Sequence, residues 1–175
     1  MHKMLAMIIW ALTAAAATAA QTFSFASVDG GMLRFSDWKG QPVLVVNTAS
    51  RCGYTHQYNG LQALHERFSK QGLVVLAVPS NDFRQELASA KDVQAFCEVN
   101  FDLTLPMTDI TTVTGPDAHA FYQWVRQETG FAPTWNFNKV LIAPDGSVAG
   151  TFGSKTRPQS RTMLNAIRAV LDGAY

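Results

Sequence analysis

The stretch of sequence that decides the fold is VLVVNTASRCGYT, residues 43–55. Its first four residues, Val43 to Val46, form the aliphatic, β-branched run of a strand that is buried on both faces, as in a parallel sheet. Small and polar residues follow, and an amphipathic helix then begins. Cys52 therefore lies where a strand leads into a helix, at the carboxyl end of the strand, where open α/β sheets place their chemistry. Helix N-termini favour anions, so a thiolate is stabilised at such a position.

The sequence on either side of this stretch predicts one α/β domain. Alternating segments around Asp29-Gly30-Gly31 predict an N-terminal β-hairpin. Leucine and phenylalanine at helical spacing predict a helix that Gly72 stops, and Pro79 ends the strand that follows. The remaining expected elements are a helix at 90–97, a helix opened by Pro116 and Asp117, strands at 140–142 and 148–152, and a last helix from 158 to 171. This order is that of a thioredoxin-like fold, a central mixed sheet flanked by helices with an N-terminal β-hairpin.

Length and charge exclude some classes of protein. A chain of 175 residues buries enough apolar surface to fold without disulfide bonds. Its formal net charge of +1 gives no electrostatic footprint for nucleic acid, which is therefore not an expected partner. No metal is expected, because His56, His65 and His119 lack metal-ligand spacing with the cysteines.

The first 20 residues are expected to be a secretory signal peptide, which leaves residues 21–175 as the domain. A weakly basic start with Lys3 is followed by an apolar stretch at 4–12 and then by small residues up to Ala20. The apolar stretch is short for a stable membrane span, and an uncleaved N-terminal anchor is the alternative. We therefore expect an exported protein, periplasmic or otherwise secreted.

Export affects how the two cysteines are interpreted. In an oxidising compartment, Cys52 and Cys97 suggest a structural disulfide by default. A domain of this size does not require that bond to fold. A bridge that forms and breaks is therefore at least as plausible as a permanent one.

Three segments, in this order, resemble the signature motifs of the glutathione peroxidase family. NTASRCGYT at 47–55 is similar to the peroxidatic motif, PSNDFRQE at 79–86 to the glutamine-bearing segment, and WNFNK at 135–139 to the motif with tryptophan and asparagine. The resemblance extends from about residue 23 to residue 171. The chain looks like the short, monomeric form of the family, because the long insert of tetrameric members is absent.

The resemblance implies a role for several residues. Cys52 matches the peroxidatic cysteine, and Cys97 matches the resolving cysteine of the thioredoxin-dependent branch. The polar residues around the peroxidatic cysteine are then Gln85, Trp135 and Asn136. The implied reaction reduces hydrogen peroxide or an organic hydroperoxide, with a thioredoxin-like dithiol protein or glutathione as the reductant and no cofactor.

These residue types suit peroxide chemistry. Only a thiolate attacks a peroxide oxygen, and the product is a sulfenic acid. The indole N–H of Trp135 and the carboxamides of Gln85 and Asn136 are neutral donors that stabilise an anion and a leaving oxygen. Judged alone, Trp135 and Asn136 are more often a core tryptophan and a capping asparagine, but the Cys52 motif favours the functional interpretation.

The neighbouring polar residues are expected to support this chemistry. The segment before Gln85 is one residue shorter than the family pattern, and Asn81 is a second amide within reach if Gln85 points away. Arg51 is expected to favour the thiolate of Cys52. Arg51 and Lys139 are otherwise solvated cations, either of which could meet a carboxylate on a reductant.

Two other functions stay open at this point. A thiol–disulfide oxidoreductase shares the fold but usually needs Cys-x-x-Cys, whereas the chain has Cys52-Gly53-Tyr54-Thr55. A non-catalytic secreted binding domain would use a structural bridge between the two cysteines. Cys97 lies on the apolar stripe of its helix, so an inert core cysteine is the alternative to a resolving one.

Overall fold

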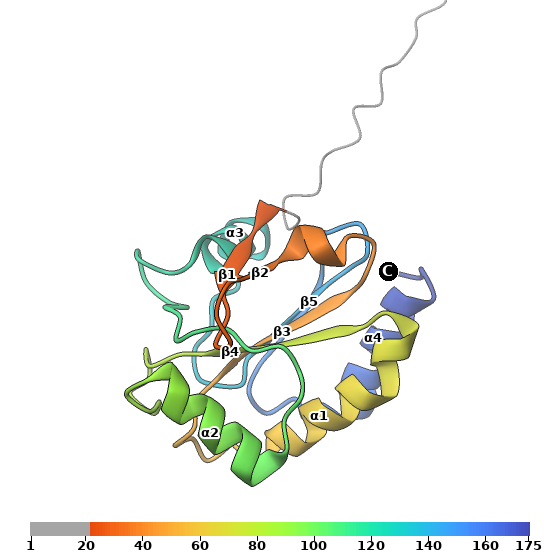
Figure 1. Ribbon diagram of the computed structural model, residues 1–175. Coiled ribbons are helices and arrows are strands. Elements are labelled where there is room, and N and C mark those ends of the chain that lie inside the picture. Colours follow the sequence, from red (N-terminus) through yellow and green to blue (C-terminus); the bar gives the residue numbers. More distant parts are fainter. Residues whose placement is uncertain (1–21) are drawn as a thin grey trace, which may run out of the picture.

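A four-stranded mixed sheet forms the centre of the computed structural model, which describes residues 22–175 (Figure 1). The leader predicted at residues 1–20 lies outside the described residues. The strand order is β4-β3-β5-β6, with β3 parallel to β4 and β5 antiparallel to both of its neighbours. The strands are β3 (Val43–Thr48), β4 (Val74–Pro79), β5 (Lys139–Ile142) and β6 (Val148–Phe152).

Three helices cover one face of this sheet (Figure 1). They are α1 (Gln57–Phe68), which connects β3 to β4, α2 (Ala90–Phe101) and α4 (Arg161–Leu171). The opposite face is covered by α3 (Ala120–Thr129) and by the predicted hairpin of β1 (Ser24–Ala26) and β2 (Met32–Arg34).

The alternation of side chains along β3 explains why both faces need a cover. Leu44 and Val46 belong to the core shared with α1, α2 and α4, whereas Val43 and Val45 belong to the core under α3 and the hairpin. All six residues of β3 are buried. The hydrophobic run that predicted a strand buried on both faces is thus confirmed, and so is the thioredoxin-like fold.

Two predicted helix starts are wrong by about one turn. Pro116 and Asp117 precede α3, which begins at Ala120 because the His119 ring accepts the Phe121 N–H as a cap. The last helix begins at Arg161 and not at Pro158, because the Ser160 hydroxyl caps the Met163 N–H.

Among residues 22–175, no helix has the length and apolar character needed to cross a membrane.

Candidate active site

Cys52 lies in the turn that joins β3 to α1, and its side chain is only 4% exposed. Because α1 begins at Gln57, the amide that reaches the sulfur comes from the turn and not from the first turn of the helix. The Tyr54 N–H donates a hydrogen bond to Cys52 Sγ over 3.4 Å. The thiol is free, and Cys52 belongs to the hydrophobic core that also contains residues of α1 and α2.

Gln85 is brought to the Cys52 turn despite its shortened loop. The Arg51 N–H donates to the Gln85 carbonyl over 2.8 Å, so the residue next to Cys52 is bound to the Gln85 backbone. The Asn136 Nδ2 donates to Gln85 Oε1 over 3.1 Å. Asn81 has a different place: it is exposed, and its Oδ1 accepts the Glu86 N–H within the same loop.

Trp135 and Asn136 lie in the turn before β5, and Asn47 at the end of β3 binds this turn. The Asn47 Nδ2 donates to the Trp135 carbonyl over 3.0 Å, and the Asn138 N–H donates to Asn47 Oδ1 over 3.0 Å. Trp135 is 39% exposed and its ring contacts that of Phe83 at a tilt, whereas Asn136 is fully buried. The turn therefore presents an exposed indole beside a buried carboxamide.

Glu86 is a further member of the site that the sequence interpretation missed. Its Oε1 accepts the Ser50 N–H over 3.0 Å and the Leu87 N–H over 2.8 Å, so it binds the Cys52 turn to the Gln85 loop. Burial raises the pKa of this carboxyl, and the hydrogen bonds from Ser50 and Leu87 oppose that shift. The only sequence signal for it is its position next to Gln85.

Cys97 lies on the buried face of α2 and is 1% exposed. It borders a cavity of about 130 Å³ between α2 and the segment 103–107. Burial raises the pKa of the Cys97 thiol to about 12, and Glu86 and Glu98 add to this effect. The reduced protein therefore holds Cys97 as a free, neutral thiol, and no disulfide joins it to Cys52.

Both expectations for Lys139 are wrong: it is neither a solvated cation nor accessible to a carboxylate on a reductant. Its side chain is 0% exposed, and its Nζ donates to Gln57 Oε1 over 2.6 Å and to the Phe137 carbonyl over 2.8 Å. Burial lowers the pKa of Lys139 to about 7. The sequence gave no signal that Lys139 is buried, because its partner Gln57 lies 82 residues away in the chain. Arg51, by contrast, is exposed.

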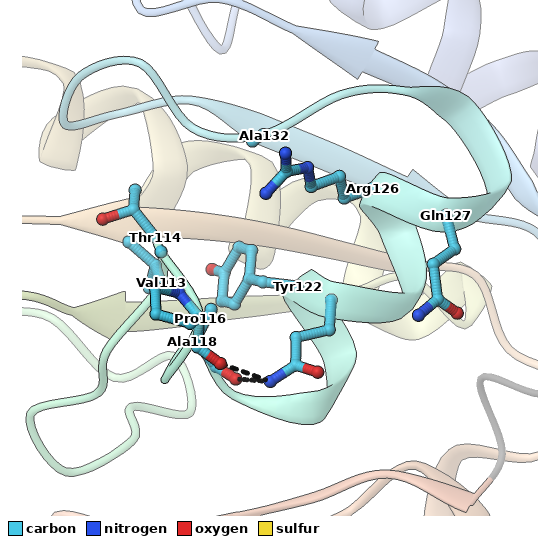
Figure 2. Close-up of a pocket in the computed structure, with 10 residues that line it drawn as sticks. Val113, Thr114, Pro116, Ala118, Tyr122, Arg126, Gln127 and Ala132 are labelled. Carbon is cyan, nitrogen blue, oxygen red and sulfur yellow. Dashed lines mark hydrogen bonds between the residues drawn. The ribbon is translucent and has the colours of Figure 1, made fainter.

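A cavity of about 360 Å³ lies away from these residues, between α3 and the segment 113–118 (Figure 2). Tyr122 and Arg126 extend from α3 along this cavity, and no predicted site residue lines it. Within residues 22–175, no three histidine, cysteine or acidic side chains lie close enough together to hold a metal ion.

Solved structures share the thioredoxin-like fold of this chain. A crystal structure of Trgpx in its apo form matches with a TM-score of 0.71 and 31% identity, over 89% of this chain and 97% of that chain. A thiol:disulfide interchange protein of the thioredoxin family from Chlorobium tepidum matches with a TM-score of 0.63. Its 17% identity shows a shared fold only.

Sequence comparison shows to which family of thioredoxin-like proteins the chain belongs. The family model for glutathione peroxidase matches residues 20–126. A glutathione peroxidase of Lactococcus lactis subsp. cremoris is 39% identical over 142 residues, which are 78% of this chain and 90% of that protein. The hydroperoxy fatty acid reductase gpx1 of Synechocystis sp. is 36% identical over 158 residues, which are 84% and 94% of the two chains. The chain therefore belongs to the glutathione peroxidase family, and it is a peroxidase.

Two variants of Glu86 separate its hydrogen bonds from its size. Glu86→Ala leaves the buried Ser50 N–H and the part-buried Leu87 N–H without their acceptor, which costs about 1–3 kcal/mol of stability. Glu86→Gln keeps a side-chain oxygen at the same place and is expected to lose much less. Urea unfolding of both variants measures this difference, and equal losses would contradict the role of the Ser50 contact.

The buried Lys139 makes stability depend on pH in a definite direction. In the unfolded chain its pKa returns to about 10.5, so above pH 7 the unfolded state binds more protons than the folded state. Stability is therefore expected to rise between about pH 7 and 8.5, by up to about 1.4 kcal/mol per pH unit.

Lys139→Met removes the titrating amino group. We expect the free energy of unfolding of this variant, measured with urea at each pH, to change less with pH than that of the wild type. This window lies above the titration of His119, whose pKa is lowered, and below that of Cys97 and the buried tyrosines, whose pKa values are raised. The same slope in wild type and variant would exclude Lys139 as its source.

Proposed function

We propose that this chain is an exported thiol peroxidase that uses Cys52 as its peroxidatic cysteine and Cys97 as its resolving cysteine. As a member of the glutathione peroxidase family it reduces hydroperoxides through a thiol. The observation that carries the proposal is the pair of hydrogen bonds that link Gln85 to Arg51 and to Asn136. They gather two carboxamides around the turn that holds the cysteine.

In the first step the Cys52 thiolate attacks one oxygen of the hydroperoxide. The O–O bond breaks, an S–O bond forms, and the other oxygen leaves as an alkoxide or hydroxide that takes up a proton. The Tyr54 N–H donates a hydrogen bond to the sulfur. The donors available for the leaving oxygen are the carboxamides of Asn136 and Gln85 and the indole of Trp135. Cys52 is left as a sulfenic acid.

In the second step the Cys97 sulfur attacks the sulfenic sulfur, a disulfide forms, and water leaves. The buried Cys97 has to come out of the core for this, because a disulfide requires the two Cα atoms to lie within about 7 Å. Helix α2 is suited to local unwinding, since it fully buries only Val93 and Cys97. Val99, also on α2, is 84% exposed.

In the last step a dithiol protein of the thioredoxin type reduces the disulfide by thiol–disulfide exchange. Glutathione is the second candidate reductant. Hydrogen peroxide and organic hydroperoxides are both proposed substrates, and the Synechocystis relative is named for the reduction of a hydroperoxy fatty acid. The contact between the rings of Trp135 and Phe83 places an apolar surface next to Asn136, which suits an organic peroxide.

Serine variants of the two cysteines test these roles. Cys52→Ser is expected to abolish peroxide turnover, on the order of a thousandfold or more, while the protein stays folded. Cys97→Ser is expected to oxidise once at Cys52 at the wild-type rate and then to stop when only a thioredoxin-type dithiol is supplied. Stopped-flow oxidation and coupled turnover assays measure the two rates. Peroxide turnover that survives Cys52→Ser would contradict the proposal.

Export is tested separately in a Gram-negative host. The full chain is expected to appear in the periplasmic fraction with a new N-terminus just after Ala19 or Ala20, as read by intact mass and N-terminal sequencing. A chain that keeps Met1 and stays with the cytoplasmic fraction would contradict export. A chain that keeps Met1 and sediments with membranes would support the uncleaved anchor instead.

A further inference from the structure

A ring of hydrogen bonds lies behind the site, and the buried Lys139 closes it. The Lys139 Nζ binds Gln57 Oε1, and the Gln57 Nε2 donates to the Ser154 carbonyl over 2.7 Å. The Ser154 hydroxyl donates to the Asn136 carbonyl over 2.6 Å. The next residue in the sequence is Phe137, and its carbonyl accepts the second hydrogen bond from Lys139, which completes the ring.

The ring joins the two segments that carry the site. Gln57 is the first residue of α1 and follows the Cys52 turn by only a few residues. Asn136 and Phe137 form the turn whose carboxamide meets Gln85. Lys139 therefore holds the helix that leads away from Cys52 against the turn that carries Asn136.

The backbone at this turn needs such support. Phe137 has a φ of 60°, a left-handed conformation that bulky residues rarely adopt without support from their surroundings. The carbonyl of this same residue accepts a hydrogen bond from the Lys139 amino group. Release of that carbonyl would let the turn relax and would move the side chain of Asn136, the residue just before it.

Nothing in the packing alone accounts for a lysine here. Its two hydrogen-bond partners are neutral carbonyl oxygens, and it is fully buried. A buried amino group without a carboxylate is unfavourable compared with an apolar residue of similar size. A buried lysine of this kind is therefore explained best by a function of its hydrogen bonds.

We propose that Lys139 is a positioning residue for the peroxide reaction, which fixes the Asn136 carboxamide against Gln85 by binding Gln57 and the strained Phe137 carbonyl. This inference rests on the proposed function, because it assigns Lys139 to the oxidation of Cys52. It makes no contact with the peroxide. Its effect is confined to the step in which the leaving oxygen needs a donor at a fixed place.

The test uses the full-length protein and compares two reactions of the same sulfur. In Lys139→Met, the rate of Cys52 oxidation by hydrogen peroxide is expected to fall about 10- to 100-fold. Alkylation of Cys52 by iodoacetamide, followed by peptide mass spectrometry, is expected to change little, because it needs the thiolate but no donor for a leaving oxygen. The exposed Lys70→Met is the matched control, with both rates as in wild type.

A second comparison shows whether the effect passes through Asn136. In an Asn136→Ala background, Lys139→Met is expected to add no further loss of the peroxide rate. If Lys139→Met fails to fold, Gln57→Met takes its place. It removes one acceptor of the same amino group, and the same selective loss is expected.

Three outcomes overturn this inference alone, and a fourth overturns the proposed function with it. Peroxide and alkylation rates that fall together would show general disorder of the turn, and an unchanged peroxide rate would show that Lys139 has no part in the reaction. A further loss in the Asn136→Ala background would place its action elsewhere. A wild-type protein in which peroxide reacts with Cys52 no faster than with a free thiol would overturn the proposed function as well.

Discussion

The site depends on how Asn47 binds the turn at 135–138. Regular antiparallel pairing between β3 and β5 ends at Val46 and Lys139. Beyond that point the backbone of Asn47 makes two hydrogen bonds to the turn, and its side chain makes two more. One residue at the end of the central strand therefore fixes the turn that carries the indole and the buried carboxamide. The same strand continues directly into the turn that carries Cys52, so both halves of the site share one support.

Several polar side chains are buried around this support. Glu86 links the Cys52 turn to the Gln85 loop, and Lys139 links α1 to the Asn136 turn. Each such group is unfavourable inside a protein unless its partners are placed correctly, so the loops have few alternative arrangements. Fixed loops keep neutral donors such as the Asn136 carboxamide in place, and a reaction with a developing oxyanion requires preorganised donors. Cys97 is the contrasting case, because it lies on a helix that fully buries only Val93 and Cys97.

The fold and the cysteine could be predicted from sequence because their signals are local. Four consecutive aliphatic residues, Val43–Val46, favour a strand that is buried on both faces. Cys52 follows this strand closely in the sequence. The supports could not be predicted in this way. Lys139 and Glu86 look like ordinary surface charges in the sequence, and only contacts with residues distant in the chain decide that they are buried. The helix start expected at Pro116 failed for a related reason, since the cap at His119 depends on a side chain that the pattern does not identify.

The most direct test of the central claim adds one equivalent of hydrogen peroxide to the reduced protein and maps both cysteines by non-reducing peptide mass spectrometry. The account predicts fast loss of the Cys52 thiol, followed by a Cys52–Cys97 disulfide that a thioredoxin-type dithiol reverses. Oxidation that stops at Cys52 as a sulfenic or sulfinic acid would contradict the resolving role of Cys97. A lack of fast reaction at Cys52 would contradict the account as a whole.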